Sequence, residues 1–383
     1  MKAIDKKIGI IGGGQLGKMM ILEAKRLGFY VVTLDPDPDC SAHSVSDEHM
    51  VASFFDEAAF NELSNKVDVI TYDLEGIDAE ALSKLERGGK PVYPSAESLK
   101  LIQDKFVQKT TLQNKGILVP KLEAINTLDD LRNYAARNGY PICLKTCKGG
   151  YDGKGVYAIK TEADLENGFN TLGAGQKPLM VEEFINFKIE VSVVATRGID
   201  GSKVVYPVVD NTHVNNICDV SIVPVNLPAN VIDTIKQTAE KVMDIFAGVG
   251  TFAVEMFIGQ NNEVYVNEVA PRPHNSGHYT IEGCRVNQFE NHVRAVVGLP
   301  LGDTSLLHGA VLMRNLLGQS DGRATVEGLE EAYKLPGVNV HIYGKPVSKK
   351  LRKMGHYTVT AATLDEAKAI DKQVMELVKI IGV

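Results

Sequence analysis

The alternation of apolar and polar residues along this chain predicts short strands that alternate with helices. Apolar runs at residues 7–11, 30–34 and 67–72 are typical of buried strands, and an amphipathic repeat that ends near residue 27 predicts a helix after the first of them. A strand, a helix and a second strand in this order indicate a βαβ unit. We therefore expect a parallel sheet at the start of the chain.

The same patterns divide the rest of the chain into further elements. Amphipathic repeats predict helices at residues 95–116, 128–138, 231–246, 286–297 and 365–381. Runs rich in β-branched and aromatic residues predict strands at residues 141–145, 178–185, 188–196, 204–209, 310–315 and 338–343. The result is an α/β protein, and its 383 residues suffice for two or three domains of ~100–200 residues each.

A hairpin is predicted in the second half of the chain. Residues 251–258 and 263–270 are rich in Val, Phe, Tyr and Met, and the four residues between them are polar. If residues 261–262 form a two-residue loop, Ile258 lies opposite Tyr265 and the pairing continues back along both strands.

In that register two glutamates, Glu255 and Glu268, stand directly opposite each other. Their Cβ atoms would be ~4.5–5.5 Å apart, where two carboxylates repel by about 3 kcal/mol at an effective dielectric constant near 20. Either the pair shares a proton or a cation lies between them, and oxygen ligands favour Mg²⁺ completed by substrate phosphates. The alternative is a slipped register that sends one glutamate to solvent.

Polar side chains crowd the loop that follows this hairpin. They stand among two prolines and a glycine, and they are Arg272, His274, Asn275, Ser276, His278 and Tyr279. Such a loop is often only a surface turn. Because this one leaves the strand beside two facing carboxylates, we interpret it as part of the same site.

Two glycine-rich loops indicate phosphate binding. Gly12, Gly14 and Gly17 match GxGxxG at a helix start, where free N–H groups attract any phosphate, and Asp35 lies where a dinucleotide fold places its ribose-binding acid. A tight structural turn and an NAD-dependent oxidoreductase are the alternatives for this loop. The second loop, residues 148–155, carries four glycines and two lysines and is typical of a lid over a polyphosphate, with a flexible surface hairpin as its alternative.

Weaker signals lie elsewhere in the chain. Glu75, which follows the strand at 67–72, is a candidate ligand for a sugar hydroxyl. Five cations fall within nine residues, and they are Lys345, Lys349, Lys350, Arg352 and Lys353. They predict a site for a phosphate monoester, although most such runs are only solvated surface.

Composition narrows the classes of partner. A net charge of −7 argues against nucleic acid or an anionic membrane as a partner, which leaves a small molecule. The five cysteines have no metal-ligand spacing and are expected to be free thiols in a reducing compartment. With no apolar run of ~18 residues, a cytoplasmic location is expected.

Four stretches carry a resemblance to a known family. They are IIGGGQLGKM at residues 10–19, KTCKGGYDGKG at 145–155, NEVAPRPHNSGHYT at 267–280 and RKMGH at 352–356. They resemble the ATP-grasp superfamily and, within it, the 5-(carboxyamino)imidazole ribonucleotide synthases of purine biosynthesis. The resemblance implies an N-terminal Rossmann-like βαβ domain at 1–120, a small α+β lid domain at 121–187 and a C-terminal α+β domain at 188–383.

The resemblance also implies site residues. ATP would be bound by Lys105, Lys145, Gly150, Tyr151, Asp152, Gly153, Lys154, Gly155, Val156, Glu182, Glu183, Phe184, Ile185, Glu190, His213, Asn267 and Glu268. Mg²⁺ would be held by Glu255 and Glu268. The ribonucleotide would be bound by Gly14, Gln15, Leu16, Glu75, Lys345, Arg352 and Lys353. The reacting centre would be formed by Tyr151, Asp152, Arg272, His274 and Asn275.

The implied reaction joins ATP, bicarbonate and 5-aminoimidazole ribonucleotide in a cytoplasmic homodimer. Asp152 and His274 are the candidates for a general base. A formate-dependent ligase related to glycinamide ribonucleotide transformylase is the nearest alternative, because it shares PRPH but continues differently. The chain departs from the family pattern at residues 71–76, where TYDLEG replaces TYEFEN and a side-chain amide is lost, and at Cys147, where arginine is common.

Overall fold

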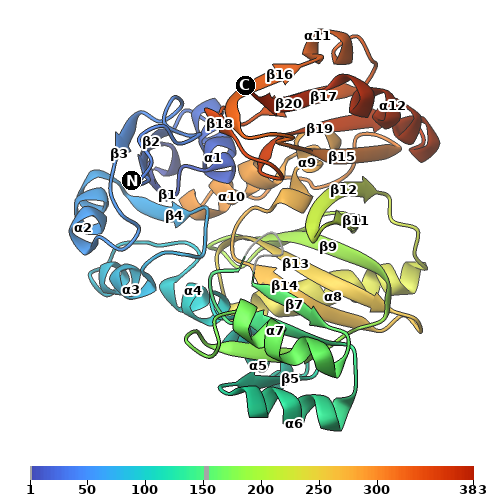
Figure 1. Ribbon diagram of the computed structural model, residues 1–383. Helices are drawn as coiled ribbons and strands as arrows, with labels where there is room; N and C mark the ends of the chain where they lie inside the picture. Colours follow the sequence, from blue (N-terminus) through green and yellow to red (C-terminus); the bar gives the residue numbers. More distant parts are fainter. Residues whose placement is uncertain (1, 151–154) are drawn as a thin grey trace.

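The computed structural model describes residues 2–150 and 155–383. Its first unit is a parallel sheet (Figure 1, blue). The strand order is β3 (Glu48–Met50), β2 (Tyr30–Leu34), β1 (Lys7–Ile11) and β4 (Val69–Tyr72). The helices of this unit are α1 (Gln15–Arg26), α2 (Glu57–Lys66), α3 (Ala79–Arg87) and α4 (Ala96–Ile102). The predicted βαβ unit is confirmed, and because the strands are parallel their carboxyl ends open at one edge.

A small antiparallel sheet forms a second unit (Figure 1, green). Its order is β5 (Leu122–Ile125), β8 (Leu179–Glu183), β6 (Ile142–Thr146) and β7 (Val156–Ile159). It packs its apolar side chains with those of α6 (Leu128–Asn138) and α7 (Leu165–Thr171). Thr127 and Asp130 form a capping box at the start of α6, which fixes where this helix begins.

A nine-stranded sheet spans the rest of the molecule. Its main path is β14 (Val264–Ala270), β13 (Gly250–Gly259), β9 (Phe187–Arg197), β11 (Val209–Val214), β12 (Ile217–Val223), β15 (Ala310–Leu317), β19 (Lys353–Ala361) and β17 (Val338–Ile342), and β10 (Lys203–Val205) pairs with β9. All these pairings are antiparallel. The pairing of β12 with β15 joins the central and C-terminal parts into one sheet.

The period-two pattern of β9 and β13 separates a core face from a polar face. Val191 and Val193 of β9 and Val254 of β13 pack with α8 (Ala229–Phe246) in the largest core cluster. Side chains alternate along a strand, so Ser192 and Glu255, which are paired across β9 and β13, point away from α8. The face opposite α8 is therefore polar at Ser192 and Glu255, where a site can form, whereas Val194 and Ala253 of the same face pack in a smaller apolar cluster.

Further elements complete the chain. They are α5 (Lys105–Asn114), α9 (Thr280–Gly283), α10 (Gln288–Val297), α11 (Leu329–Ala332), α12 (Leu364–Leu377) and the sheet of β18 (Val347–Ser348), β16 (Gly322–Glu327) and β20 (Lys379–Gly382). The α10 helix packs with α1 through Phe289 and Val293, which joins the first unit to the large sheet. None of the helices in the described part of the chain is long and apolar enough to cross a membrane.

Three predicted elements differ from the structure. The predicted helix at 95–116 is two helices, because Asp104 caps the start of α5 by accepting from the amides of Phe106 and Val107. The predicted strand at 204–209 is wrong, since β10 ends at Val205 and β11 begins at Val209. The predicted last helix ends at Leu377, and the β-branched residues after it pair with β16 as β20.

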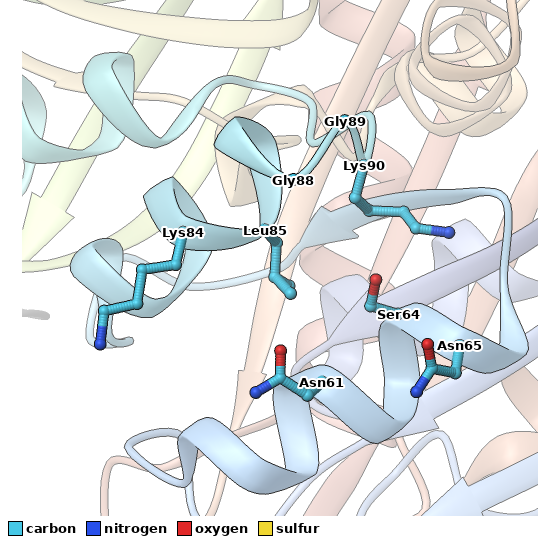
Figure 2. Close-up of a pocket in the computed structure, with 8 residues that line it drawn as sticks. All are labelled: Asn61, Ser64, Asn65, Lys84, Leu85, Gly88, Gly89 and Lys90. Carbon is cyan, nitrogen blue, oxygen red and sulfur yellow. The ribbon is translucent and has the colours of Figure 1, made fainter.

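A surface hollow of about 540 Å³ lies between α2 and the end of α3 (Figure 2). Its walls include Asn61 and Asn65 of α2, with Lys84 and Lys90 across from them. Lys84 is paired with Glu57 at 2.7 Å, and the Lys90 amine donates to the carbonyl of Val67 at 2.6 Å. No predicted site residue lines this hollow.

Candidate active site

The β13–β14 hairpin pairs the two predicted metal ligands, but its turn and register differ from those predicted from the sequence. Glu255 and Glu268 are directly paired, as predicted. The predicted pairing of Ile258 with Tyr265 is wrong, because Ile258 pairs with Val264. The turn has three residues and ends at Asn262, which has a left-handed φ of 72°.

A bulge in β14 then restores the glutamate pair. Met256 faces Val266 and Glu255 faces Glu268, so Asn267 is the extra residue of β14. The Lys145 amine donates to the side-chain oxygen of Asn267 at 3.3 Å, which shows that the bulged residue is directed at the lysine of β6.

Burial and like charge set the protonation of the glutamate pair. Burial raises the pKa of Glu255 to about 7, and the neighbouring carboxylates of Glu190 and Glu268 add to this effect. Burial also opposes ionisation of Glu268, but Lys105, whose amine lies 2.5 Å from its carboxylate, outweighs burial and lowers its pKa. A divalent cation would relieve the repulsion at Glu255, so the donor set fits Mg²⁺, with phosphate oxygens completing the coordination.

A buried ion-pair cluster lies beside the pair. The Glu182 carboxylate forms ion pairs with the amine of Lys145, at 2.8 Å, and with the amine of Lys109, at 2.5 Å. The side chains of Lys109 and Glu182 are each only 2% exposed. Burial alone would raise the pKa of Glu182, but the two lysines outweigh it and lower the value to about 2. Burial lowers the pKa of Lys109 to about 8.

Lys109 was missed by the sequence analysis. It stands four residues after Lys105 on α5, a spacing that places both amines on one helix face. That spacing was the available signal. Gln108 holds the same helix against β14, because its side-chain amide donates to the Val269 carbonyl and accepts from the Val269 amide.

The other predicted ATP-binding residues lie on segments around this cluster. Gly155 and Val156 lead into β7, beside Lys145 on the paired strand β6. Glu183 to Ile185 leave β8, with Phe184 48% exposed. His213 lies in β11 with its ring 3.2 Å from Glu190 of β9. Gly150 precedes the gap, whereas Tyr151, Asp152, Gly153 and Lys154 lie outside the described residues.

The loop after β14 is held by specific side-chain partners. The Arg272 guanidinium contacts both oxygens of Glu75, at 2.9 and 3.2 Å, so two residues predicted for different roles form one ion pair. Asn275 exchanges two hydrogen bonds with Asn315 of β15, at 2.7 and 2.8 Å. Asn315 was also missed, because nothing in the local sequence links it to residue 275.

His274 lies between this loop and the glutamate pair. Its Nε2 atom is 3.6 Å from a carboxylate oxygen of Glu255. Its Nδ1 atom contacts the Ser276 hydroxyl at 2.9 Å. Burial, and then the charge of Arg272, lower the pKa of His274 well below its usual range, so the ring is neutral at physiological pH.

The N-terminal glycine loop holds carboxylates. The amides of Gly14 and Gly17 each donate to Asp73 at 3.0 Å, and the amide of Gly13 donates to Asp35 at 2.7 Å. A Cβ atom on Gly12 would lie 1.7 Å from an Asp73 oxygen, which is why glycine is required there. Asp73, which follows β4, therefore occupies the position expected for a phosphate, and Asp35 caps the loop.

The two ends of the chain meet beside this loop. The Lys18 amine of α1 donates to the carbonyl of Tyr343 at 3.2 Å. The Lys345 amine donates to the Lys353 carbonyl at 2.7 Å, and Arg352 donates to the Val347 carbonyl at 2.9 Å. Gln15 and Leu16 lie in the first turn of α1, on the side of the first unit that approaches this basic segment.

Domain comparisons identify the class of protein. The ATP-grasp domain family matches residues 110–289. The ribonucleotide synthetase preATP-grasp domain matches residues 5–103, and the C-terminal domain of phosphoribosylaminoimidazole carboxylase matches residues 311–370. The fold and the facing glutamates thus belong to an ATP-grasp enzyme, as the sequence predicted.

Whole-chain comparisons give the family. An N5-carboxyaminoimidazole ribonucleotide synthase of Staphylococcus aureus is 40% identical over 94% of both chains, and one of Bacillus subtilis is 41% identical over 94% of this chain and 92% of its own. This chain belongs to the N5-carboxyaminoimidazole ribonucleotide synthase family. The predicted family, fold and ligase class are confirmed.

Solved structures agree with this assignment. The synthetase of Thermotoga maritima superimposes with a TM-score of 0.90 at 42% identity, over 99% of this chain and all of the other. The enzyme of Aspergillus clavatus in complex with ADP and 5-aminoimidazole ribonucleotide gives a TM-score of 0.89 at 31% identity, over 97% of this chain and 98% of its own.

Proposed function

We propose that this protein carboxylates 5-aminoimidazole ribonucleotide with bicarbonate at the expense of ATP, in purine biosynthesis. The observation that carries the proposal is the Glu255–Glu268 pair flanked by Lys105 and Lys145. Two hard oxygen donors beside buried amines suit a magnesium polyphosphate. The relatives named for this reaction, one of them in complex with ADP and 5-aminoimidazole ribonucleotide, support the choice of substrates.

In the first half of the reaction, bicarbonate attacks the γ-phosphate to give carboxyphosphate. Mg²⁺ held by Glu255 and Glu268 would neutralise charge on the phosphates. Lys105 and Lys145 stabilise the negative charge that grows on the transferring phosphoryl group, because they lie in a site with little solvent. Glu182 keeps Lys145 extended towards the site, and Lys109 neutralises the second oxygen of Glu182.

In the second half, the exocyclic amine of the ribonucleotide captures the carboxyl group. Arg352 and Lys353 bind the phosphate of this substrate, together with Lys18 of α1, which the structure brings to the same segment. Asp73 and Asp35 already accept from the amides of Gly13, Gly14 and Gly17, so we assign the phosphate to the basic segment and the ribose to the loop and Glu75. We expect a cytoplasmic homodimer, as the family resemblance implies, and light scattering tests the oligomeric state.

The test is an assay of phosphate release by the purified protein with ATP and Mg²⁺. Release is expected to depend on both bicarbonate and 5-aminoimidazole ribonucleotide and to need no nicotinamide. Full activity with formate and glycinamide ribonucleotide in their place would overturn the proposed substrates and keep the ATP-grasp class. Omission of Mg²⁺, with chelator present, is expected to stop turnover.

A further inference from the structure

A buried chain of hydrogen bonds crosses the polar face of the large sheet and ends at His274. Ser192 of β9 is paired with Glu255 of β13, so both side chains point to the face that carries the site. Ser192 is fully buried, as is Ser221 of β12, and Asn211 of β11 lies between them. Buried hydroxyls and amides of this kind are retained only when each finds a partner.

Each group in this chain donates its hydrogen bond to the next group towards His274. The Ser221 hydroxyl donates to the side-chain oxygen of Asn211 at 2.7 Å, and the Asn211 amide donates to the Ser192 hydroxyl at 2.8 Å. The Ser192 hydroxyl in turn donates to the Ser276 hydroxyl at 2.8 Å. Ser276 is left with its own proton to give, and Nδ1 of His274 is 2.9 Å from its oxygen.

A backbone group fixes the direction at the end of the chain. The amide of Ser276 donates to Nδ1 of His274 at 3.3 Å. A backbone N–H has no acceptor role, so this contact requires Nδ1 to carry no proton whichever way the hydroxyls rotate. In a neutral imidazole the proton then resides on Nε2, the atom that faces Glu255 at 3.6 Å.

We propose that Ser276 and Ser192 are positioning residues that hold His274 as a neutral Nε2–H donor to the bicarbonate reactant. This inference rests on the proposed function. In the proposed function, lysines bind the ATP phosphates and the C-terminal basic segment binds the ribonucleotide phosphate. Bicarbonate is therefore the anionic reactant that has no assigned hydrogen-bond donor. Held in this way, His274 donates a hydrogen bond and accepts no proton from the substrate amine, and the general base is another group.

The location of the proton is measured directly by nitrogen NMR of protein labelled with ¹⁵N-histidine, with His274→Gln used to assign the signal. We expect Nε2 to be protonated and Nδ1 to be unprotonated in the wild type. In Ser276→Ala and Ser192→Ala the amide of residue 276 still donates to Nδ1, so the same tautomer is expected, with the Nδ1 signal shifted because the hydroxyl hydrogen bond is lost or weakened. A wild-type ring protonated on Nδ1 would overturn the proposal. Because this measurement needs no turnover, it stands even if the proposed substrates are wrong.

Steady-state kinetics provide a second test of the proposal. Ser192→Ala is expected to raise the KM for bicarbonate or lower kcat by roughly 5- to 10-fold, the effect of one hydrogen bond, with the KM for ATP unchanged. The matched control is Thr196→Val, on the same strand, which removes a buried hydroxyl that is paired with Thr251 at 2.8 Å and does not belong to the hydrogen-bond chain from Ser221 to His274. Equal effects of the two variants on every kinetic constant would reduce Ser192 to a structural role and overturn the proposal.

Two substitutions of His274 separate donor from base. Glutamine places an amide N–H near the position of Nε2, whereas asparagine places its amide near Nδ1, and neither is a base. If His274 is a donor, His274→Gln keeps more carboxylation activity than His274→Asn. Equal loss of activity in both variants, with the fold intact, would contradict the donor role. Absence of ribonucleotide-dependent turnover in the wild type would instead refute the proposed function.

Discussion

Lys109 shows how one buried side chain supports a site that it need not touch. It neutralises one oxygen of Glu182, and the other oxygen holds Lys145. Two cations on one carboxylate leave the cluster with a net positive charge, which favours a polyphosphate. Removing Lys109 would leave Glu182 buried with a single partner, and such half-removed pairs are costly.

We predict that Lys109→Met destabilises the protein by roughly 1–3 kcal/mol, because one oxygen of the buried Glu182 loses its partner, and raises the KM for ATP, because the cluster loses its net positive charge. Urea unfolding measures the first effect and steady-state kinetics the second. Lys100→Met is the control, since Lys100 forms an exposed pair with Glu80 at 2.7 Å and should cost less than about 1 kcal/mol. Similar costs for the two variants would show that Lys109 is not a structural ion in this cluster.

A second prediction concerns the two facing glutamates. Glu255→Gln and Glu268→Gln should each lower kcat by ~10²–10³-fold or more, because one remaining carboxylate does not balance the cation and the transferring phosphate. The unfolding midpoint of Glu255→Gln should stay near or above that of the wild type, since the amide removes the repulsion within the pair, whereas that of Glu268→Gln should fall because the ion pair with Lys105 is lost. Near-normal activity of either variant at low Mg²⁺ would contradict the assignment of metal ligands.

At the scale of elements, the glycine loop and the end of β4 form one unit through Asp73. Burial raises the pKa of Asp73 to about 6, although the amides of Gly17 and Gly14 favour its charge. The folded-state pKa is thus above the unfolded value. The contribution of this group to stability is therefore full below its unfolded pKa and is lost as pH rises through 6.

We predict that Asp73→Asn stabilises the protein above pH 6 and has little effect near pH 4. The asparagine keeps an acceptor for the two amides and carries no charge, so the gain at pH 8 is at most about 3 kcal/mol. Thermal or urea unfolding of both proteins at pH 4.5, 6 and 8 measures it. A variant that is less stable than the wild type at pH 8 would show that the carboxylate charge holds the loop.

Most of these helices and strands could be predicted from the sequence, and the exceptions have a physical cause. The apolar runs of β1 and β2 and the β-branched and aromatic residues of β9 and β13 predicted these strands, because strands that are buried on both faces are rich in such residues. The glutamate pair was predicted through an incorrect register, since a three-residue turn and the bulge at Asn267 compensate each other. A bulge depends on partners from other strands, here Lys145, and local sequence does not encode it.

The same reason explains which site residues were missed. Lys109, Asp73 and Asn315 act through partners more than 35 residues away in the chain, so their local sequence looks like ordinary helix, strand end or strand. The motifs at 145–155 and 267–280 could be identified because several functional residues are adjacent there. Their roles, and the domain bounds 1–120, 121–187 and 188–383, stay predictions.

At the scale of the whole molecule, the first and last parts of the chain meet around one proposed substrate. Arg352→Ala should raise the KM for 5-aminoimidazole ribonucleotide by roughly ten- to a hundredfold, because a charge-assisted hydrogen bond to phosphate contributes ~1.5–3 kcal/mol. The KM for ATP should be unchanged. Initial rates with each substrate varied in turn measure both constants.

Arg323→Ala is the matched control for that variant, since Arg323 is an exposed arginine on the neighbouring strand β16, opposite Val347. It should leave both constants near their wild-type values. An equal loss toward ATP in Arg352→Ala, or no loss at all, would remove the C-terminal basic segment from the ribonucleotide site.

The pairing of β12 with β15 has a consequence for substrate selection. Lys353 begins β19, and Glu255 and Glu268 lie in β13 and β14 of the same continuous sheet. Backbone hydrogen bonds across the intervening strands therefore fix the distance between the proposed phosphate anchor and the proposed phosphoryl-transfer centre. If the basic segment anchors the ribonucleotide phosphate as proposed, the site selects its substrate by length: a ribonucleotide of the right length presents its amine to the carboxyl donor, and a shorter or longer molecule anchored at its phosphate does not.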